Sequence, residues 1–278
     1  MSHYVVAVIT RYEPDEETLR EILAPYDENL SVPRYVKRTK AQIIADARAY
    51  NERYYNGRYA EYLKDPKKYS EENQNESHIQ FIRDEFPKIY RMNDEELYQN
   101  EIKNTPKLSE LEDGDESTAI DEDGNETSCY NPNSKWDWWE VGGRWYGEVP
   151  LRDGGETNSA QLRDIDFGND VSIAAYLEKN PDVKTRYESL MNDGDGWYRL
   201  EYIQKRYPTL EDYVNHQKNW HTYALVDENG EWHEPGAMGW FGCSDTTPEG
   251  EIEWEKTFYD KFIKGKDNYW LTIVDCHI

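Results

Sequence analysis

The chain has 278 residues, enough for one large domain or two small ones. Its 57 Asp and Glu residues outnumber 32 Lys and Arg residues, a formal net charge of −25, yet 14% of the residues are aromatic. Disordered acidic chains are poor in aromatic residues, so the composition excludes that class and predicts a folded protein with an aromatic core and an acidic surface. Such a surface repels nucleic acid and anionic membranes, and no apolar run approaches the ~20 residues that span a bilayer.

The three cysteines, Cys129, Cys243 and Cys276, are too few and too scattered for a disulfide framework. Because the sequence has no CxxC pair and no signal-peptide hydrophobic region, we expect a cytosolic protein with reduced thiols. A disulfide between two copies through Cys276 is the less favoured alternative, and the composition leaves a homo-oligomer open.

Residues 4–9 and 270–274 are short, continuous apolar runs that predict one buried strand near each end of the chain. Strands placed in this way commonly lie side by side in one sheet. We therefore predict that they pair or neighbour, which makes the core discontinuous in sequence.

A helix is predicted over residues 39–64, with Thr39 as its N-cap. Its apolar positions are spaced by four, three and four residues, as one helix face requires: Ile43, Ala47, Tyr50 and Tyr54. Two further helices are predicted over residues 71–86, closed by Pro87, and over residues 94–104.

Residues 110–126 carry nine acidic side chains in seventeen positions. The segment differs from an EF-hand because its glycine, Gly124, is in the fourth place, where a calcium loop needs it in the sixth. We interpret Asp123-Gly124 as a hairpin turn and predict no calcium site. Five of the acidic residues are predicted to form part of a binding surface: Glu110, Glu112, Asp113, Asp115 and Glu116.

Residues 136–145 contain four tryptophans around Gly142-Gly143 and Arg144, which predicts a hairpin over residues 135–149. Strand alternation would bury Trp136 and Trp138, with Trp145 as a further candidate for that face, and would expose Trp139 beside Asp137. The block is therefore predicted to be mostly structural. Trp and Arg are enriched at binding hot spots, so the predicted contacts are Trp139, Arg144, Trp145 and, from a later segment, Trp240.

The second half of the chain predicts a segment of mixed helical character over residues 159–179, an exposed loop over 192–196 and a helix over 210–218. Residues 223–226 and 231–233 flank Asn229-Gly230 and predict a hairpin. An amphipathic helix over residues 249–264 precedes the last strand.

These elements predict an α+β fold: a mixed or antiparallel sheet formed from both ends of the chain and central hairpins, with helical insertions. The predicted core consists of residues 1–38, 120–155 and 219–278. Residues 39–119 are a helical insertion with the acidic loop, and residues 156–218 are a mainly helical insertion.

No GxSxG, HExxH or P-loop motif is present, and we predict no catalytic residue, metal or cofactor. Asp137, Glu140 and Arg144 resemble a hydrolytic carboxylate pair only weakly, because acidic pairs arise by chance at this composition. A zinc site of Cys276 and His277 with Cys243 or His3 would require the two chain ends to meet, and zinc ligands normally come in pairs close in sequence.

The chain resembles a family of acidic, mostly uncharacterised proteins encoded by phages and prophages. Five segments carry the resemblance: MSHYVVAVI at residues 1–9, APYDENL at 24–30, NPNSKWDWWEVGGRW at 131–145, GEWHEPGAMGWFG at 230–242 and VDCHI at 274–278. The resemblance implies an accessory phage gene that acts in the host cytoplasm. Some phage inhibitors of the Gabija defence nuclease are similar in size and acidity, which extends this expectation to counter-defence.

Three hypotheses for the function follow. The first is a non-enzymatic protein that inhibits a host defence complex by binding it through an acidic and aromatic surface; the partner would be basic or would handle nucleic acid, because charge speeds such an encounter. The second is a sponge or hydrolase for a nucleotide signal, with Trp139 and Trp240 stacking on the base and Arg144 binding phosphate. The third is an accessory or structural protein without such a partner.

Overall fold

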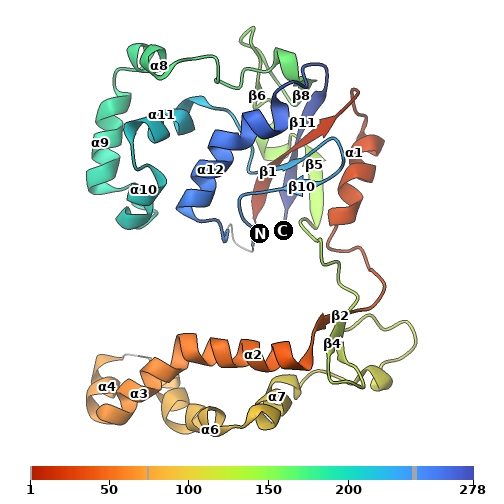
Figure 1. Cartoon of the computed structure of the whole chain (residues 1–278), viewed down its shortest axis with the longest axis vertical. Coiled ribbons are helices and arrows are strands. Elements are labelled where there is room, and N and C mark those ends of the chain that lie inside the picture. Colours follow the sequence, from red (N-terminus) through yellow and green to blue (C-terminus); the bar gives the residue numbers. More distant parts are fainter. Residues whose placement is uncertain (1, 74, 240–242) are drawn as a thin grey trace. The chain divides into compact units, whose positions relative to one another are not determined.

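The computed structural model describes residues 2–73, 75–239 and 243–278. The chain forms two compact units. The sheet unit consists of the residues up to Leu30 together with Asn131–Ile278, and the helical unit is Ser31–Tyr130. Helices and mixed and antiparallel sheets are both present (Figure 1), which confirms the predicted α+β class. No described helix is both long and apolar enough to cross a membrane.

The sheet unit is built on a six-stranded sheet in the order β10-β9-β1-β11-β5, with β8 also paired to β11. Strand β1 (His3–Thr10) and β11 (Trp270–His277) are antiparallel over their full length, with Val6 opposite Val274. The predicted pairing of the strands near the two ends is therefore confirmed. Strand β9 (Ala224–Val226) runs parallel to β1 on its other side, and β10 (Trp232–His233) completes the hairpin predicted at Asn229-Gly230.

Alternate residues of β1 and β11 enter two separate cores, as strand geometry requires. On one face, Val6 and Val274 pack beneath α1 (Glu16–Leu23). On the other face, Ala7 and Ile273 pack with Phe258 of α12 (Pro248–Phe258), which continues into a π-helical turn at Tyr259–Ile263. We call these the α1 face and the α12 face.

The prediction of a hairpin over residues 135–149 is wrong. Strand β5 (Trp138–Val141) pairs with β11, whereas β6 (Val149–Pro150) pairs with β7 (Glu156–Thr157). Gly142 and Gly143 have φ of 72° and 51°, and a Cβ on Gly143 would lie 2.4 Å from the Cβ of Asp275. These glycines lead the chain into a 3₁₀ turn, Gly143–Trp145, that leaves the sheet instead of folding back along β5.

Residues 159–218 belong to the sheet unit. Strand β8 (Ser159–Gln161) joins β11, and four helices follow: α8 (Ile173–Lys179), α9 (Val183–Asp193), α10 (Leu200–Arg206) and α11 (Leu210–Lys218). Helix α11 confirms the helix predicted over residues 210–218. The loop predicted over 192–196 begins two residues later, because α9 extends to Asp193 and ends at Gly194, whose φ is 73°.

The first helix of the helical unit begins where predicted. Thr39 caps α2 (Lys40–Asn51) and forms a capping box with Gln42. A π-helical turn, Glu52–Asn56, links α2 to α3 (Gly57–Lys64) and shifts the helical phase. Contrary to the prediction of a buried face, Tyr54, within this turn, and Tyr50, in α2 before it, are both exposed.

The helix predicted over residues 71–86 is divided. It consists of α4 (Pro66–Glu72), α5 (Glu76–Gln80), a π-helical turn (Phe81–Glu85) and α6 (Phe86–Arg91). Pro87 lies in the first turn of α6, where a missing N–H is tolerated, so it does not close the helix as predicted. Helix α7 (Asp94–Ile102) follows as predicted.

A small sheet explains where the helical unit begins and ends. Strand β4 (Glu126–Ser128) pairs with both β2 (Tyr35–Arg38) and β3 (Ala119–Ile120). The unit therefore spans Ser31–Tyr130, wider than the insertion predicted over residues 39–119. The turn between β3 and β4 contains Gly124 at φ 83°, which confirms the predicted Asp123-Gly124 hairpin turn.

Candidate functional site

The tryptophan block lies at the outer strand of the sheet, but its exposure differs from the prediction. Trp136 is 7% exposed and donates its indole N–H to the Leu23 carbonyl at 3.2 Å. Trp138 is 46% exposed, whereas Trp139 is half-buried on the α1 face. The predicted burial of Trp138 and exposure of Trp139 are thus reversed. The reason is that β5 starts at Trp138, so strand alternation does not extend back to Trp136, which bridges to Asp27 instead.

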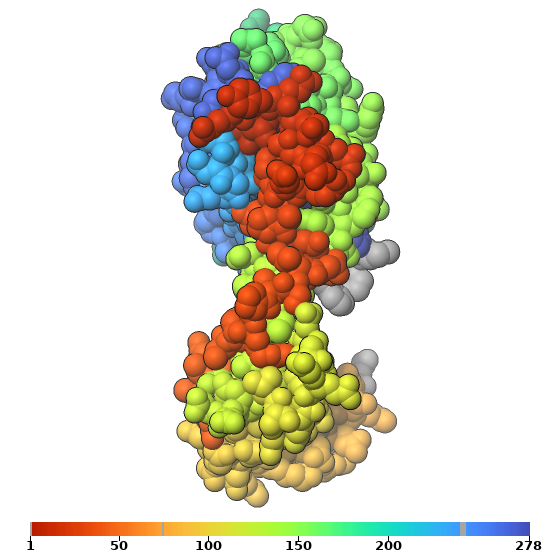
Figure 2. Space-filling view, turned by 90° about the vertical axis from the view of Figure 1, so that its right-hand side faces the viewer, coloured from red at the N-terminus to blue at the C-terminus, as the bar shows by residue number. Residues whose placement is uncertain are grey.

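Strand β5 and helix α1 enclose a groove of about 380 Å³, which we call the edge groove. Its lining is aromatic and mostly acidic: Glu16, Arg20, Trp136, Asp137, Trp138, Trp139, Glu140 and Val141. The one cation, Arg20, already pairs with Glu16 at 2.7 Å and with Glu17 at 2.5 Å. Figure 2 views the sheet unit from this side, with the red N-terminal residues at the surface.

Next to the edge groove, the ends of β1 and β11 bring two histidine–carboxylate pairs together. His3 contacts Asp275 at 2.9 Å and His277 contacts Asp137 at 2.5 Å, with the two imidazole rings 4.9 Å apart. The buried Asp275 carboxylate also accepts the Arg144 backbone N–H at 3.0 Å. These contacts fix β5 and the following turn against the strands near both chain ends.

The zinc ligand set weighed for this region is not assembled. Cys276 is fully buried on the α1 face. Its burial, and to a smaller extent the nearby Asp275 charge, raise the pKa of its thiol well above the ordinary value. His277, the next residue along β11, lies on the opposite face. A buried thiol is also unable to reach a second copy, so the structure argues against an intermolecular disulfide through Cys276.

The remaining predicted contact residues are dispersed. Arg144 is exposed, and Trp145 is half-buried against the α12 face. Trp240 lies outside the described residues. All five acidic residues predicted for the surface are exposed, and they belong to the helical unit: Glu110, Glu112, Asp113, Asp115 and Glu116.

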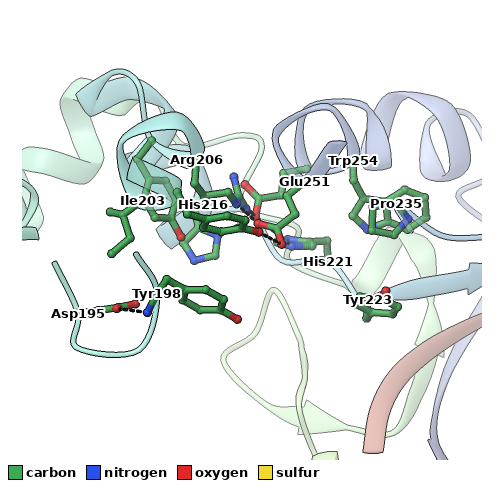
Figure 3. A pocket seen from close by; sticks show the side chains of 13 residues that line it. Asp195, Tyr198, Ile203, Arg206, His216, His221, Tyr223, Pro235, Glu251 and Trp254 are labelled. Carbon is green, nitrogen blue, oxygen red and sulfur yellow. Dashed lines mark hydrogen bonds and ion pairs between the residues drawn. The ribbon is translucent and has the colours of Figure 1, made fainter. Parts of the chain in front are cut away.

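A cavity of about 300 Å³ that the sequence analysis missed lies between α10, α11 and α12 (Figure 3). We call it the tyrosine pocket, because four tyrosines line it together with Trp254: Tyr198, Tyr202, Tyr207 and Tyr223. The four-residue spacing of Tyr202 and Arg206 was a usable signal in the sequence, since residues one helical turn apart share a face. The partners from α11 and α12 could not be inferred, because they approach only through the tertiary fold.

A buried ion network forms one wall of this pocket. Arg206 bonds to both Glu251 and Glu255, and Glu255 Oε1 also accepts from His216 at 2.7 Å and lies 3.4 Å from His221. Burial alone would raise the pKa of Glu255, but the two histidine hydrogen bonds and the Arg206 charge outweigh it and lower that pKa. Glu255 is therefore held ionised.

Tyr202 and Tyr207, two of the tyrosines that line the pocket, keep their protons. Burial and a 2.9 Å hydrogen bond to Glu251 raise the pKa of Tyr202, and burial raises the pKa of Tyr207 to about 12. Tyr198 stacks on Tyr202 with ring centroids 5.0 Å apart and planes inclined by 16°. The pocket thus presents neutral aromatic rings beside fixed carboxylates.

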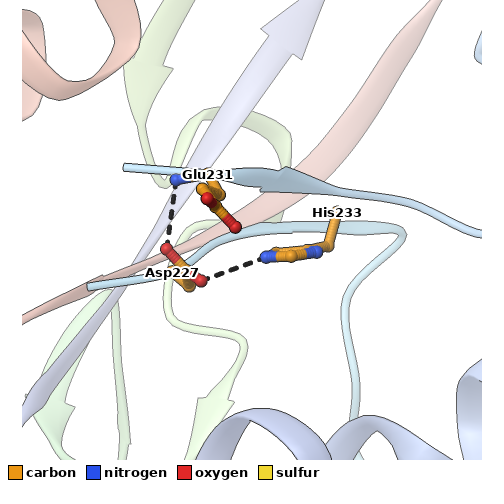
Figure 4. A group of neighbouring side chains, drawn as sticks. All are labelled: Asp227, Glu231 and His233. Atoms are coloured by element: carbon orange, nitrogen blue, oxygen red, sulfur yellow. Dashed lines mark hydrogen bonds and ion pairs between the residues drawn. The ribbon is translucent and has the colours of Figure 1, made fainter. Parts of the chain in front are cut away.

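One group of described side chains could hold a metal ion: Asp227, Glu231 and His233, whose ligand atoms lie within 4.8 Å of one another (Figure 4). Asp227, however, accepts the backbone N–H groups of Asn229 and Glu231 in the β9–β10 turn and contacts His233 Nε2 at 3.1 Å. The hairpin's own hydrogen bonds account for the arrangement, so we assign no metal to it.

No protein-family model, curated protein or solved structure matches this chain.

Proposed function

We propose that this protein acts by binding a basic partner protein in the edge groove and has no catalytic role of its own. The observation that carries the proposal is the combination found there: an outer strand, an exposed Trp138 and flanking carboxylates in one groove. The net charge of −25 adds long-range attraction toward a basic partner.

The backbone of β5 offers the first contribution to binding. Within the described part of the chain, β5 pairs only with β11, so its other edge presents backbone N–H and C=O groups. An extended segment of a partner can add to such an edge, with main-chain hydrogen bonds giving affinity. The groove beside the strand then selects the side chains of that segment.

The side chains of the edge groove supply specificity. Trp138 provides a large exposed ring of the type that dominates binding hot spots. Asp137 and Glu140 place negative charge next to it, while Arg20 is neutralised by its own helix. This pattern favours lysine or arginine side chains on the incoming segment and disfavours acidic ones.

The resemblance to phage accessory proteins extends the proposal to the partner and the compartment. In that setting the partner is a host protein in the host cytoplasm, and a basic host protein that handles nucleic acid fits the charge. Inhibition of an anti-phage defence complex is the corresponding outcome for the host.

The alternative of a nucleotide pocket built from Trp139, Arg144 and Trp240 receives less support. Trp139 packs on the α1 face, whereas the turn that carries Arg144 is bonded to Asp275 on the α12 face. The acidic lining of the edge groove also opposes a phosphate.

Affinity capture from host lysate, followed by binding measurements on the purified captured protein, tests the proposal. The groove variant Trp138→Ala/Glu140→Lys should lose binding at least about tenfold, as expected for a hot-spot residue with a reversed charge. The matched control Tyr146→Ala/Glu148→Lys changes an exposed aromatic and an exposed acid of the same segment outside the groove. Equal binding by both variants, or capture of an acidic partner, would contradict the proposal.

A further inference from the structure

We propose that the tyrosine pocket is a binding site for an organic cation, an alkylammonium or guanidinium group. The pocket shares no lining residue with the edge groove. The inference therefore stands independently of the proposed function, and each site can fail its own test without affecting the other.

The charge of the lining favours a cation. Three carboxylates, Asp195, Glu251 and Glu255, line the pocket with one arginine, Arg206, and two histidines that both contact Glu255, His216 and His221. Glu251 contacts Arg206 and Tyr202, and 33% of its side chain remains exposed. With this excess of acid the pocket repels phosphate and carboxylate ligands, and its partial enclosure strengthens the attraction for a positive charge.

The aromatic rings supply the second requirement. Cations are attracted to the faces of Tyr and Trp rings, and several rings around one cavity form a cage for alkylammonium groups. The pocket already shows this preference, because the guanidinium carbon of Arg206 lies 4.9 Å from the centroid of the Tyr207 ring. The same guanidinium also pairs with Glu251 and Glu255, while its Nη1 finds no hydrogen-bond acceptor among the described residues.

The rim of the pocket is held ready by a local turn. Asp195 accepts the backbone N–H groups of Trp197 and Tyr198, both at 2.9 Å, and these bonds lower the pKa of its carboxyl. The turn sets Tyr198 at the pocket (Figure 3). Trp197, the residue before it, is 91% exposed. Because it adjoins Tyr198 in the chain, this exposed indole is available to contact the remainder of whatever molecule carries the cation.

Calorimetric titration of the full chain with matched small probes tests the site. Choline and its neutral isostere 3,3-dimethylbutan-1-ol differ mainly in charge, and agmatine presents a guanidinium. We expect both cations to bind, with the neutral isostere about tenfold weaker or more, as cation–π and charge terms require. Equal binding of choline and the neutral isostere, or no binding of either cation at millimolar concentration, would overturn the proposal.

Two substitutions with matched controls locate the binding. Tyr198→Leu removes an exposed ring, and Glu251→Gln removes a charge; both should weaken cation binding severalfold. Tyr146→Leu and Glu253→Gln make the same changes outside the pocket, the second on the same helix, and should leave binding unchanged. Thermal unfolding establishes that each variant is folded. Cation binding that is weakened by the control substitutions and unchanged by the pocket substitutions would overturn the assignment.

Competition distinguishes the source of the cation. If an arginine-rich or lysine-rich peptide displaces choline at a lower concentration than agmatine does, the natural ligand is a basic side chain of a protein. Displacement by agmatine alone assigns the pocket to a free amine.

Discussion

Trp136 and Trp138 are two residues apart, yet they have different roles in the structure. Trp136→Ala should lower the free energy of unfolding by about 3–5 kcal/mol, because it empties a buried site between α1 and the sheet. Trp138→Ala should change that free energy by less than about 1 kcal/mol, since half of its side chain is exposed. Urea denaturation of the two variants checks the prediction, and a larger loss for Trp138→Ala would refute the exposure found here.

The ionisation of Glu255 should make the free energy of unfolding depend on pH. Its pKa is lowered in the folded protein, so its ionised form stabilises the fold above the unfolded pKa of about 4.3, and this stability is lost as pH falls below that value. Glu255→Gln keeps an acceptor oxygen but removes the negative charge that Arg206 and two histidines share, and it should cost about 3–5 kcal/mol at pH 7. The difference in unfolding free energy between wild type and variant should shrink from pH 7 to pH 3; a constant difference would contradict the assignment.

The candidate sites show what residue types alone can predict. Aromatic density identified the block at residues 136–145, but which tryptophan is exposed depends on where β5 begins, and β5 is defined by β11, more than 130 positions away. The tyrosine pocket combines Tyr198, His221 and Glu255 from separate elements. Their proximity is a property of packing, which no local pattern encodes.

At the scale of elements, the turn after β5 allows a test of what requires glycine at residue 143: its positive φ alone, or also its close approach to Asp275. Gly143→Ala should destabilise the sheet unit by about 1–3 kcal/mol more than Gly154→Ala, because the first adds a Cβ against Asp275. The control has a similarly positive φ of 87° but nothing within 4 Å of the added Cβ. Thermal unfolding of the two variants measures the difference, and equal losses would show that φ alone matters.

Elements with a strong local signal were predicted well, and elements defined by distant partners were not. The Thr39 cap of α2, the helix at Leu210–Lys218 and the turn at Gly124 all follow from neighbours within a few residues. Strand β5 was assigned to a hairpin because its true partner, β11, lies at the other end of the sequence. The π-helical turns at Glu52–Asn56 and Phe81–Glu85 have no equally clear sequence signal, and they interrupt the two helices predicted over residues 39–64 and 71–86.

At the scale of the whole molecule, the net charge of −25 should appear in the kinetics of binding. Association with a basic partner should slow as salt rises toward 0.15 M, where the screening length is about 8 Å, while dissociation changes much less. Stopped-flow or surface-based kinetics across a salt series measures both rates. Association that is independent of salt would leave charge with a role in solubility only.

A five-site variant tests whether the helical unit contributes to this attraction. Replacing five exposed acids by their amides should slow association and leave dissociation nearly unchanged: Glu110, Glu112, Asp113, Asp115 and Glu116. The edge-groove variant should instead speed dissociation, because it removes contacts made in the complex. An unchanged association rate in the five-site variant would restrict steering to the sheet unit.

The pairing of β1 with β11 also sets the order in which the protein can fold during synthesis. Strand β1 leaves the ribosome before the rest of its sheet, yet its main antiparallel partner, Trp270–His277, is made after the other strands of that sheet. The helical unit is continuous from Ser31 to Tyr130, so it can close around its own core while translation proceeds. Strand β1, which precedes that unit, must wait as a nascent, unpaired strand, exposed to chaperones and to other chains, until β9 and then β11 have been made.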